Sequence, residues 1–331
     1  MKFGFIPTEG GHYYQDFLEE TLLGEKLGFD SVWLEEHHGV KNHYWPSPLI
    51  GLAGLATRTE RILLGTDILV LPFYHPVRVA EDAAMLDVIS NGRFIFGAAI
   101  GYKPDEFTLY QIHLEKRGER FEESIQLIKQ LWTQDEVNFE GKFFRLQGLK
   151  IEPRPVAKPH PPIWLGGWGN LSLRRAAQWG DAWIPGPTAN LEKLLDAQQV
   201  YQQHLRAAEI DLKSRATPLT REVVIATSDE RAYEIAEKHL LINYRDEYGS
   251  GKWQHPLIGN EDPTSTTELD IIDQDRFIIG SPETVIQKIR HFKDCFHVDH
   301  LICRLYFAGI PHQVIMEELK LLAQEVIPAF R

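Results

Sequence analysis

The sequence predicts an α/β protein, a (β/α)8 TIM barrel with insertions. Short apolar segments alternate with longer helix-like segments along the 331 residues, and the first strands recur roughly every 30 residues, the spacing of βα units. The apolar segments are nearly continuous, as in Ile62-Leu63-Leu64, which is typical of parallel strands buried on both faces. A barrel of about 250 residues plus insertions also accounts for the length.

Eight strands are expected in a repeated strand–helix order, and a doubly wound parallel sheet is the structural alternative. The expected strands are Lys2–Thr8, Ser31–His37, Ile62–Val70, Phe94–Gly101, Pro162–Gly167, Asp181–Pro185, Glu222–Thr227 and His300–Phe307. The expected helices are Tyr14–Leu27, Ser47–Thr57, Pro76–Ile89, Glu106–Trp132 with a break near Arg117-Gly118, Leu171–Trp179, Leu191–Ala208, Asp229–Leu241, Pro282–Phe292 and His312–Ala323. Gly28 is placed to end the first helix, and Ser47 followed by Pro48 is placed to begin the second.

Two segments interrupt the alternation. Residues 133–161 hold the apolar stretches Val137–Phe139 and Phe143–Leu146 before a proline-rich run, which predicts a β-hairpin or extended excursion. Residues 243–276 are long, polar and glycine-containing, and this composition fits a mobile lid and a surface loop equally well. Because no linker divides the chain, residues 1–331 are expected to form one domain.

The composition excludes several classes of protein. The chain has 35 Lys and Arg against 47 Asp and Glu, a formal charge of −12, whereas nucleic-acid binding needs a basic face. Two cysteines cannot form a disulfide framework or a four-cysteine zinc site. No apolar run approaches the roughly 20 residues of a membrane span, and no signal peptide is recognisable. These features predict a cytoplasmic enzyme with no nucleic-acid or membrane partner.

The strongest chemical signal follows the second expected strand, where Glu35, Glu36, His37 and His38 stand in a row. Active sites of (β/α)8 enzymes lie at the carboxyl ends of the strands. His37 is expected to act as a general base or acid, with Glu36 or Glu35 as its orienting carboxylate and His38 as a secondary polar contact. Alternatively, one histidine is solvated and the other structural. No metal site is expected, because the chain has no second His-x-His pair.

A second signal is the glycine-rich stretch Gly166-Gly167-Trp168-Gly169 between a strand and a helix. Glycines allow close approach of an anion to the backbone, and a helix N-terminus favours phosphate. Ser172, Arg174 and Arg175 could add a hydroxyl and charge. An ordinary βα loop is the alternative, and the spacing is not that of a dinucleotide-binding GxGxxG motif.

Together these residues resemble the bacterial luciferase-like flavin-dependent monooxygenase superfamily over most of the chain, from Met1 to about Phe330. The blocks that carry the resemblance are Gly28–His38, Leu64–Thr66 through Val70–Pro72, His75–Arg78 with Ala80–Asp82, Leu86-Asp87 through Ser90–Phe94, Pro162–Trp164 with the glycines after it, and Gly280–Glu283.

The resemblance implies a dimeric barrel that binds reduced FMN or a deazaflavin coenzyme at the strand ends. His37 matches the active-site histidine of the family, and a non-proline cis peptide is expected at Asp67-Ile68, beneath the flavin ring. The segment 243–276 matches the region of the mobile loop. The cofactor-binding residues expected are Thr66, Asp67, Ile68, Gly101, Tyr102, Gly166, Gly167, Trp168, Gly169, Asn170 and Ser172.

The chain departs from bacterial luciferase at the end of the fourth strand. Ala99 and Ile100 stand where the luciferase α chain has a cysteine and an arginine that helps to hold the flavin phosphate. Arg174, Arg175 or backbone amides are expected to take over that contact, or the cofactor differs. Trp168 and Gly169 replace the Glu and Ser of the luciferase phosphate loop, so light emission is not implied.

The function expected is a two-component flavin-dependent monooxygenase. Reduced FMN, supplied by a separate NAD(P)H:flavin reductase, would react with O2 to a C4a-peroxide that oxidises a small organic substrate. Trp33, Tyr102, Trp168 and Phe307 are candidate walls of the pocket. A deazaflavin-dependent dehydrogenase or reductase and a non-catalytic flavin-binding subunit are the two alternatives.

Overall fold

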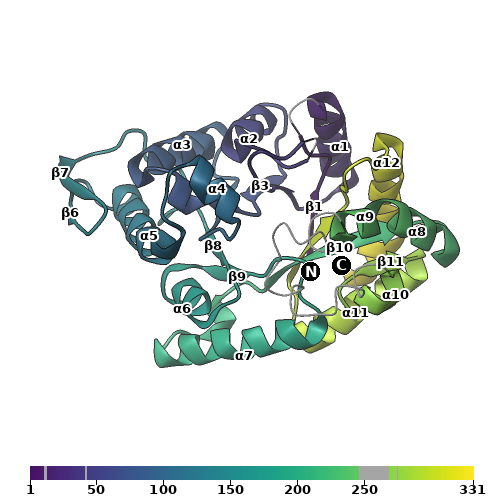
Figure 1. The fold of residues 1–331 in the computed structure, drawn as a ribbon. Coiled ribbons are helices and arrows are strands. Elements are labelled where there is room, and N and C mark those ends of the chain that lie inside the picture. The colour runs from purple at the N-terminus through teal and green to yellow at the C-terminus, as the bar shows by residue number, and fades with distance from the viewer. Residues whose placement is uncertain (11–12, 42, 246–267, 274) are drawn as a thin grey trace.

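The computed structural model describes residues 1–10, 13–41, 43–245, 268–273 and 275–331, and in them the strands form a (β/α)8 barrel (Figure 1). Eight parallel strands follow one another around it, from β12 through β1 to β9 and β10. An isolated parallel bridge between Ala182 of β9 and Ala216, just before β10, closes the ring. This closure distinguishes the fold from a doubly wound sheet. The eight strands are β1 (Lys2–Ile6), β2 (Ser31–Leu34), β3 (Leu63–Thr66), β5 (Phe94–Ala99), β8 (Ile163–Gly166), β9 (Ala182–Ile184), β10 (Pro218–Ile225) and β12 (His300–Arg304).

Two short strands were not expected from the sequence. The expected strand Ile62–Val70 is divided by the cis peptide bond Asp67-Ile68 into β3 and β4 (Leu69–Val70), and β4 pairs with β5. The strand β11 (Ile278–Gly280) pairs with the end of β10. Three residues are too few for a periodic signal. β10 also begins at Pro218, four residues before the expected start, because its first half mixes polar and apolar residues.

The helices lie around the outside of the barrel, and the chain ends meet where the Met1 amino group donates to the Phe330 carbonyl at 3.3 Å (Figure 1). Gly28, in the left-handed conformation at φ 92°, ends the first helix as expected, and Pro48 begins the second. The Ser47 side chain makes no capping hydrogen bond. The helices are α1 (Tyr14–Leu27), α2 (Pro48–Ala56), α3 (Pro76–Ile89), α4 (Pro104–Leu109), α5 (Arg117–Thr133), α6 (Asn170–Trp179), α7 (Leu191–Ala207), α8 (Asp229–Ile235), α9 (Leu241–Asn243), α10 (Leu269–Asp273), α11 (Pro282–Phe296) and α12 (His312–Leu321).

The expected helix Glu106–Trp132 is two helices, α4 and α5, with a 3-10 turn at Leu114–Lys116 between them. The first insertion forms the expected antiparallel hairpin, β6 (Val137–Glu140) and β7 (Arg145–Leu149), which projects at the left of Figure 1. Most of the second segment, 243–276, lies outside the described residues, so the lid remains a prediction.

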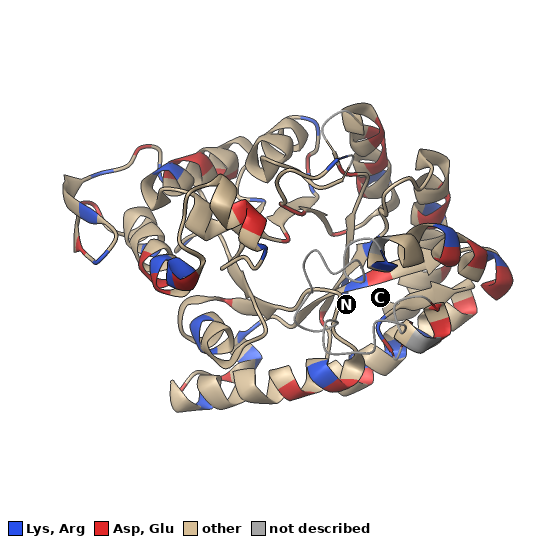
Figure 2. Ribbon diagram, in the orientation of Figure 1, with Lys and Arg blue, Asp and Glu red and all other residues tan. Residues whose placement is uncertain are grey.

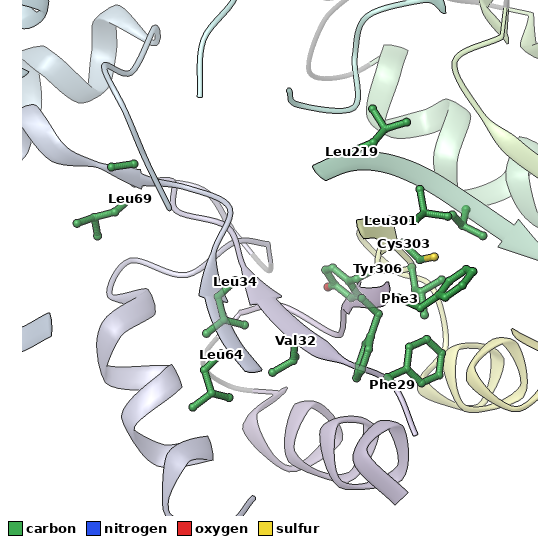
Figure 3. Packing of buried hydrophobic residues seen from close by; sticks show 14 of the residues in the cluster. Phe3, Phe29, Val32, Leu34, Leu64, Leu69, Leu219, Leu301, Cys303 and Tyr306 are labelled. Carbon is green, nitrogen blue, oxygen red and sulfur yellow. The ribbon is translucent and has the colours of Figure 1, made fainter. Parts of the chain in front are cut away.

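Alternation along the strands builds two hydrophobic layers. Phe3 and Val32 belong to the large layer between strands and helices, shown in Figure 3, whereas Trp33 faces the barrel interior and stacks on Trp164 with ring centroids 4.9 Å apart. A Cβ at Gly65 would lie 2.2 Å from the Trp33 ring, so only glycine fits there. Trp33 is therefore interior packing and not a pocket wall.

Charged residues of both signs are interspersed along the outer helices in Figure 2. The described residues include no helix that is long and apolar enough to cross a membrane. In the same part of the chain, no group of three His, Cys, Asp or Glu side chains is arranged to hold a metal ion.

Candidate active site

A cavity of about 410 Å³ opens at the carboxyl ends of the barrel strands, where (β/α)8 enzymes place their active sites. Its size is within the range of small-molecule sites, about 300–1,000 Å³. The lining residues are Glu35, Glu36, His37, Tyr44, Asp67, Ile68, Val70, Ala99, Ile100, Gly101, Tyr102, Glu106, Arg117, Gly166, Gly167, Trp168, Gly169, Ser172, Ile184, Gly186, Pro187, Thr188 and Arg304.

Most of the predicted site residues meet in this cavity, although they come from four separate strand ends. Those that line it are Glu36, His37, Asp67, Ile68, Gly101, Tyr102, Gly166, Gly167, Trp168, Gly169 and Ser172. Three predicted residues, His38, Thr66 and Asn170, do not line it. The Thr66 hydroxyl bonds to the Gly97 backbone across β3 and β5, and the Asn170 amide oxygen contacts His204 of α7. Of the other candidate walls, Phe307 is fully buried outside the lining.

His37 is held by a carboxylate that the sequence did not single out. Its Nδ1 lies 2.8 Å from Oε1 of Glu106 on α4, and the same oxygen accepts the His38 amide at 2.9 Å. Burial alone would raise the pKa of Glu106. The hydrogen bonds from His37 and from the His38 amide, together with the charge of His37, outweigh burial, so the pKa of Glu106 is lowered overall. An ionised Glu106 accepts a hydrogen bond from the Nδ1–H group of His37, which leaves Nε2 as the ring nitrogen that can exchange a proton. The Tyr44 and Tyr102 rings pack edge-on against the imidazole.

Glu36, expected to orient His37, is instead bonded elsewhere. Its Oε1 contacts His38 Nε2 at 2.9 Å and accepts the Tyr74 hydroxyl, and its Oε2 accepts the Val70 amide at 2.5 Å. His38 also contacts the Tyr110 hydroxyl. Glu36 and His38 therefore hold the loop after β2 against β4 and the chain that follows it. Because side chains alternate along an extended segment, the neighbours His37 and His38 take different partners.

The floor of the cavity holds a buried arginine among carboxylates. Arg304, the last residue of β12, donates Nε to Glu35 at 2.7 Å, while its Nη1 lies 3.4 Å from Glu222. Burial alone would lower the pKa of Arg304, but Glu35, Tyr44, Glu222 and Glu9 together raise it. Burial raises the pKa of Glu9 and of Glu222. Arg304 is thus a permanent positive charge shared by more than one carboxyl group.

Asp67 stands beside this cluster at the cis peptide that the family resemblance implied. Its Oδ2 accepts a hydrogen bond from the Thr220 hydroxyl of β10 at 2.5 Å. Burial and the Glu35 carboxylate raise the pKa of Asp67 to about 7. This side chain is therefore partly protonated near neutral pH.

The other end of the cavity is suited to an anion. Gly167, at φ 130°, makes the turn after β8 in a conformation that favours glycine, and the open Gly169 backbone leads into α6. Arg117, the first residue of α5, also lines this cavity and donates to the carbonyls of Gly101 and Leu114. Among the described residues Arg117 forms no ion pair.

The arginines that the sequence suggested for the phosphate lie outside the cavity lining. Arg174 and Arg175 both pair with Glu122 on α5. Burial and the neighbouring Arg175 guanidinium lower the pKa of Arg117. Of these three arginines, Arg117 is the one that lines the cavity together with the glycine loop. Sequence reasoning missed it because it stands in an ordinary polar helix start.

The comparisons with known proteins agree with this architecture. Residues 2–296 match the family model of luciferase-like monooxygenases. The chain is 31% identical over 242 residues to the oxygenase component of a flavin-dependent trigonelline monooxygenase of Acinetobacter baylyi, covering 70% of this chain and 65% of that protein. It is 28% identical over 342 residues to an F420-dependent glucose-6-phosphate dehydrogenase of Amycolatopsis mediterranei, covering 100% and 99% of the two chains.

Among solved structures, the monooxygenase RslO1 of Streptomyces bottropensis superimposes with a TM-score of 0.87 at 24% identity over the full length of both chains. This similarity concerns the fold. The family match, by contrast, spans most of the sequence and includes the ends of β2, β3, β5 and β8, which supply most of the cavity lining. The chain therefore belongs to the luciferase-like monooxygenase family, whose members here include both flavin-dependent and F420-dependent oxidoreductases.

Proposed function

We propose that the chain is the oxygenase component of a two-component monooxygenase that uses reduced FMN and O2 to oxidise a small organic substrate. A separate NAD(P)H:flavin reductase would supply the reduced flavin. The observation that carries the proposal is the cavity itself, which combines an anion-binding end at Arg117 with the His37–Glu106 pair. The similarity to the oxygenase component from Acinetobacter baylyi supports it.

The lining fits a flavin phosphate ester. Ile68, Val70, Ala99, Ile100 and Ile184 give the cavity apolar walls suited to a flat ring. Arg117, the Gly166–Gly169 backbone and Ser172 would hold the phosphate, in place of the luciferase arginine that Ile100 replaces. When bound, the reduced flavin would supply the electrons that activate O2.

The residues of the chain would move the proton and protect the reaction. His37 Nε2 would accept a proton from the substrate, and the ionised Glu106 would stabilise the imidazolium that results. Tyr44 and Tyr102 would keep the imidazole in place. The apolar walls would exclude water, which strengthens these electrostatic interactions.

Replacing Arg117 with methionine is expected to weaken FMN binding about tenfold or more, since a hydrogen bond to a charged group contributes roughly 1.5–3 kcal/mol. Binding of riboflavin, which has no phosphate, should stay within about twofold of the wild type. Quenching of the fluorescence of Trp168, which lines the cavity, can report both titrations. Equal losses for the two ligands would show that Arg117 does not contact the phosphate.

A deazaflavin-dependent dehydrogenase or reductase is the second candidate, because the F420-dependent relative matches the full length of this chain. Anaerobic titrations with reduced FMN and with reduced F420 separate the two candidates. We expect tighter binding of reduced FMN, and O2 consumption that exceeds the free-flavin rate when substrate is added. Exclusive binding of F420 would replace the monooxygenase proposal with the dehydrogenase.

We also propose that the chain forms a homodimer through α2 and α3. These helices pack together and expose four large apolar side chains: Ile50, Met85, Val88 and Ile89. Exposed apolar patches of this kind mark association sites. The double variant Ile50→Asp/Ile89→Asp is expected to sediment as a monomer while the wild type sediments as a dimer. Exposed Leu109 and Leu171 lie on other helices, so the matched Leu109→Asp/Leu171→Asp variant should remain dimeric.

A further inference from the structure

The charged groups that line the cavity are dominated by carboxylates. Glu35, Glu36, Asp67 and Glu106 face it, whereas the described lining contains two arginines, Arg117 and Arg304. Arg117 lies at the glycine-loop end, and Arg304 is already paired with Glu35 and with Glu222 behind it. The inner wall therefore carries more negative than positive groups.

Two of these carboxyl groups have incomplete hydrogen bonding. Asp67 accepts one hydrogen bond, from the Thr220 hydroxyl, and within the described residues it forms no ion pair. The side chain of Glu106 is 3% exposed, and among the described residues its Oε2 has no hydrogen-bond partner although Glu106 lines the cavity. A buried acceptor without a partner is costly, so the wall favours a ligand that brings a positive charge or donors.

Aromatic rings stand beside the carboxylates. Tyr44 and Tyr102 both line the cavity, and the Tyr44 ring already lies 5.6 Å from the Arg304 guanidinium and 5.2 Å from Lys103 Nζ. Aromatic faces and carboxylates in one pocket are the groups that recognise organic cations.

We propose that Asp67 and Glu35, with Tyr44, bind a positively charged group of the substrate, so that the substrates of this chain are small organic cations such as quaternary ammonium compounds. This assignment takes the cavity to be the reaction site proposed above. Asp67 supplies a carboxyl group that forms no ion pair within the described residues, and the apolar lining accepts the rest of the molecule.

The proposal predicts a pH dependence with a definite sign. Burial and Glu35 raise the pKa of Asp67 to about 7, so at pH 6 the group is mostly neutral and at pH 8 mostly ionised. Affinity for a cation should rise about tenfold from pH 6 to pH 8, because only the ionised fraction binds. The groups that act on Asp67 are Glu35 after β2, Thr220 on β10 and Arg304 on β12. Glu222 and Glu9 interact in turn with Glu35 and Arg304.

Calorimetric titration of the purified chain with choline and with its uncharged isostere 3,3-dimethylbutan-1-ol tests the proposal. We expect choline to bind at least tenfold more tightly than the alcohol at pH 8 and to lose this preference towards pH 6. In Asp67→Asn the preference and its pH dependence should disappear, whereas Asp196→Asn, an exposed position on α7, should behave as the wild type.

Equal affinities of the wild type for choline and the alcohol at pH 8 would overturn the proposal without any variant, and so would an unchanged preference in folded Asp67→Asn. An FMN titration of the same samples keeps the outcomes separate. If FMN binds and choline is not preferred, the substrate class is wrong while the proposed function stands. If choline is preferred and only F420 binds, the proposed chemistry is wrong.

Discussion

Replacing His37 with alanine is expected to lower kcat by about 10²–10⁴-fold, the usual contribution of a general acid or base. His37 is the basic group that lines the cavity with its Nδ1 fixed by an ionised carboxylate. Affinity for FMN should change little, because the phosphate end of the cavity is built from Arg117 and the glycine loop. Turnover in an assay reconstituted with a flavin reductase, together with FMN titration, measures the two effects.

Two further variants test the role of His37 more closely. Glu106→Gln keeps the shape of the side chain but cannot stabilise the positive charge that forms on His37, so a loss of kcat smaller than that in His37→Ala is expected. His113→Ala, a histidine whose side chain is 82% exposed, is the matched control. If His37→Ala turned over at the rate of His113→Ala, the catalytic role proposed for His37 would be wrong. Absence of turnover in the wild type itself would favour the third hypothesis, a non-catalytic flavin-binding subunit.

Replacing Arg304 with leucine is expected to lower the free energy of unfolding by about 3–5 kcal/mol, the cost of leaving buried carboxylates without their cation. The Arg304 side chain is 3% exposed and that of its partner Glu222 is fully buried. Urea-induced unfolding, followed by circular dichroism, measures the difference. Arg78→Leu is the control, since Arg78 is exposed and its pairs with Glu81 and Asp82 on α3 should contribute about 1 kcal/mol at most.

The loss in Arg304→Leu should shrink as the pH falls. Burial already raises the pKa of Glu222 in the folded state, and without the arginine, which opposes this shift, it rises further. The folded chain then binds more protons, so its stability falls as the pH rises and recovers in acid. A loss that is independent of pH would show that Arg304 stabilises the barrel through packing alone.

The sequence was sufficient for the order of the barrel strands and for the position of His37 in the cavity. Continuous apolar strands such as Phe94–Ala99 can be recognised in the sequence because both of their faces are buried. The carboxyl ends of such strands converge, which is why Glu36, His37, Asp67 and Gly166 could be placed in one cavity from the sequence alone. The start of β10 and the strand β11 could not be predicted, because the first half of β10 mixes polar and apolar residues and β11 is only three residues long.

The partners of the site residues could not be predicted, because they depend on tertiary contacts. Glu106 lies 69 residues after His37 and stands at the start of a short helix where acidic residues are common. Arg117 also begins a helix, and nothing local distinguishes it from Arg120. The partners of Arg304 could have been anticipated from the sequence. A charged residue that ends the apolar strand segment Leu301–Cys303 must meet partners inside the barrel.

A crystal structure of the chain with bound FMN tests the central claim most directly. We expect the flavin ring against Asp67-Ile68, the phosphate within hydrogen-bond distance of Arg117 and the Gly166–Gly169 backbone, and His37 Nε2 facing the reactive part of the ring. A flavin bound outside this cavity, or with its phosphate away from Arg117 and its ring out of reach of His37, would contradict the account.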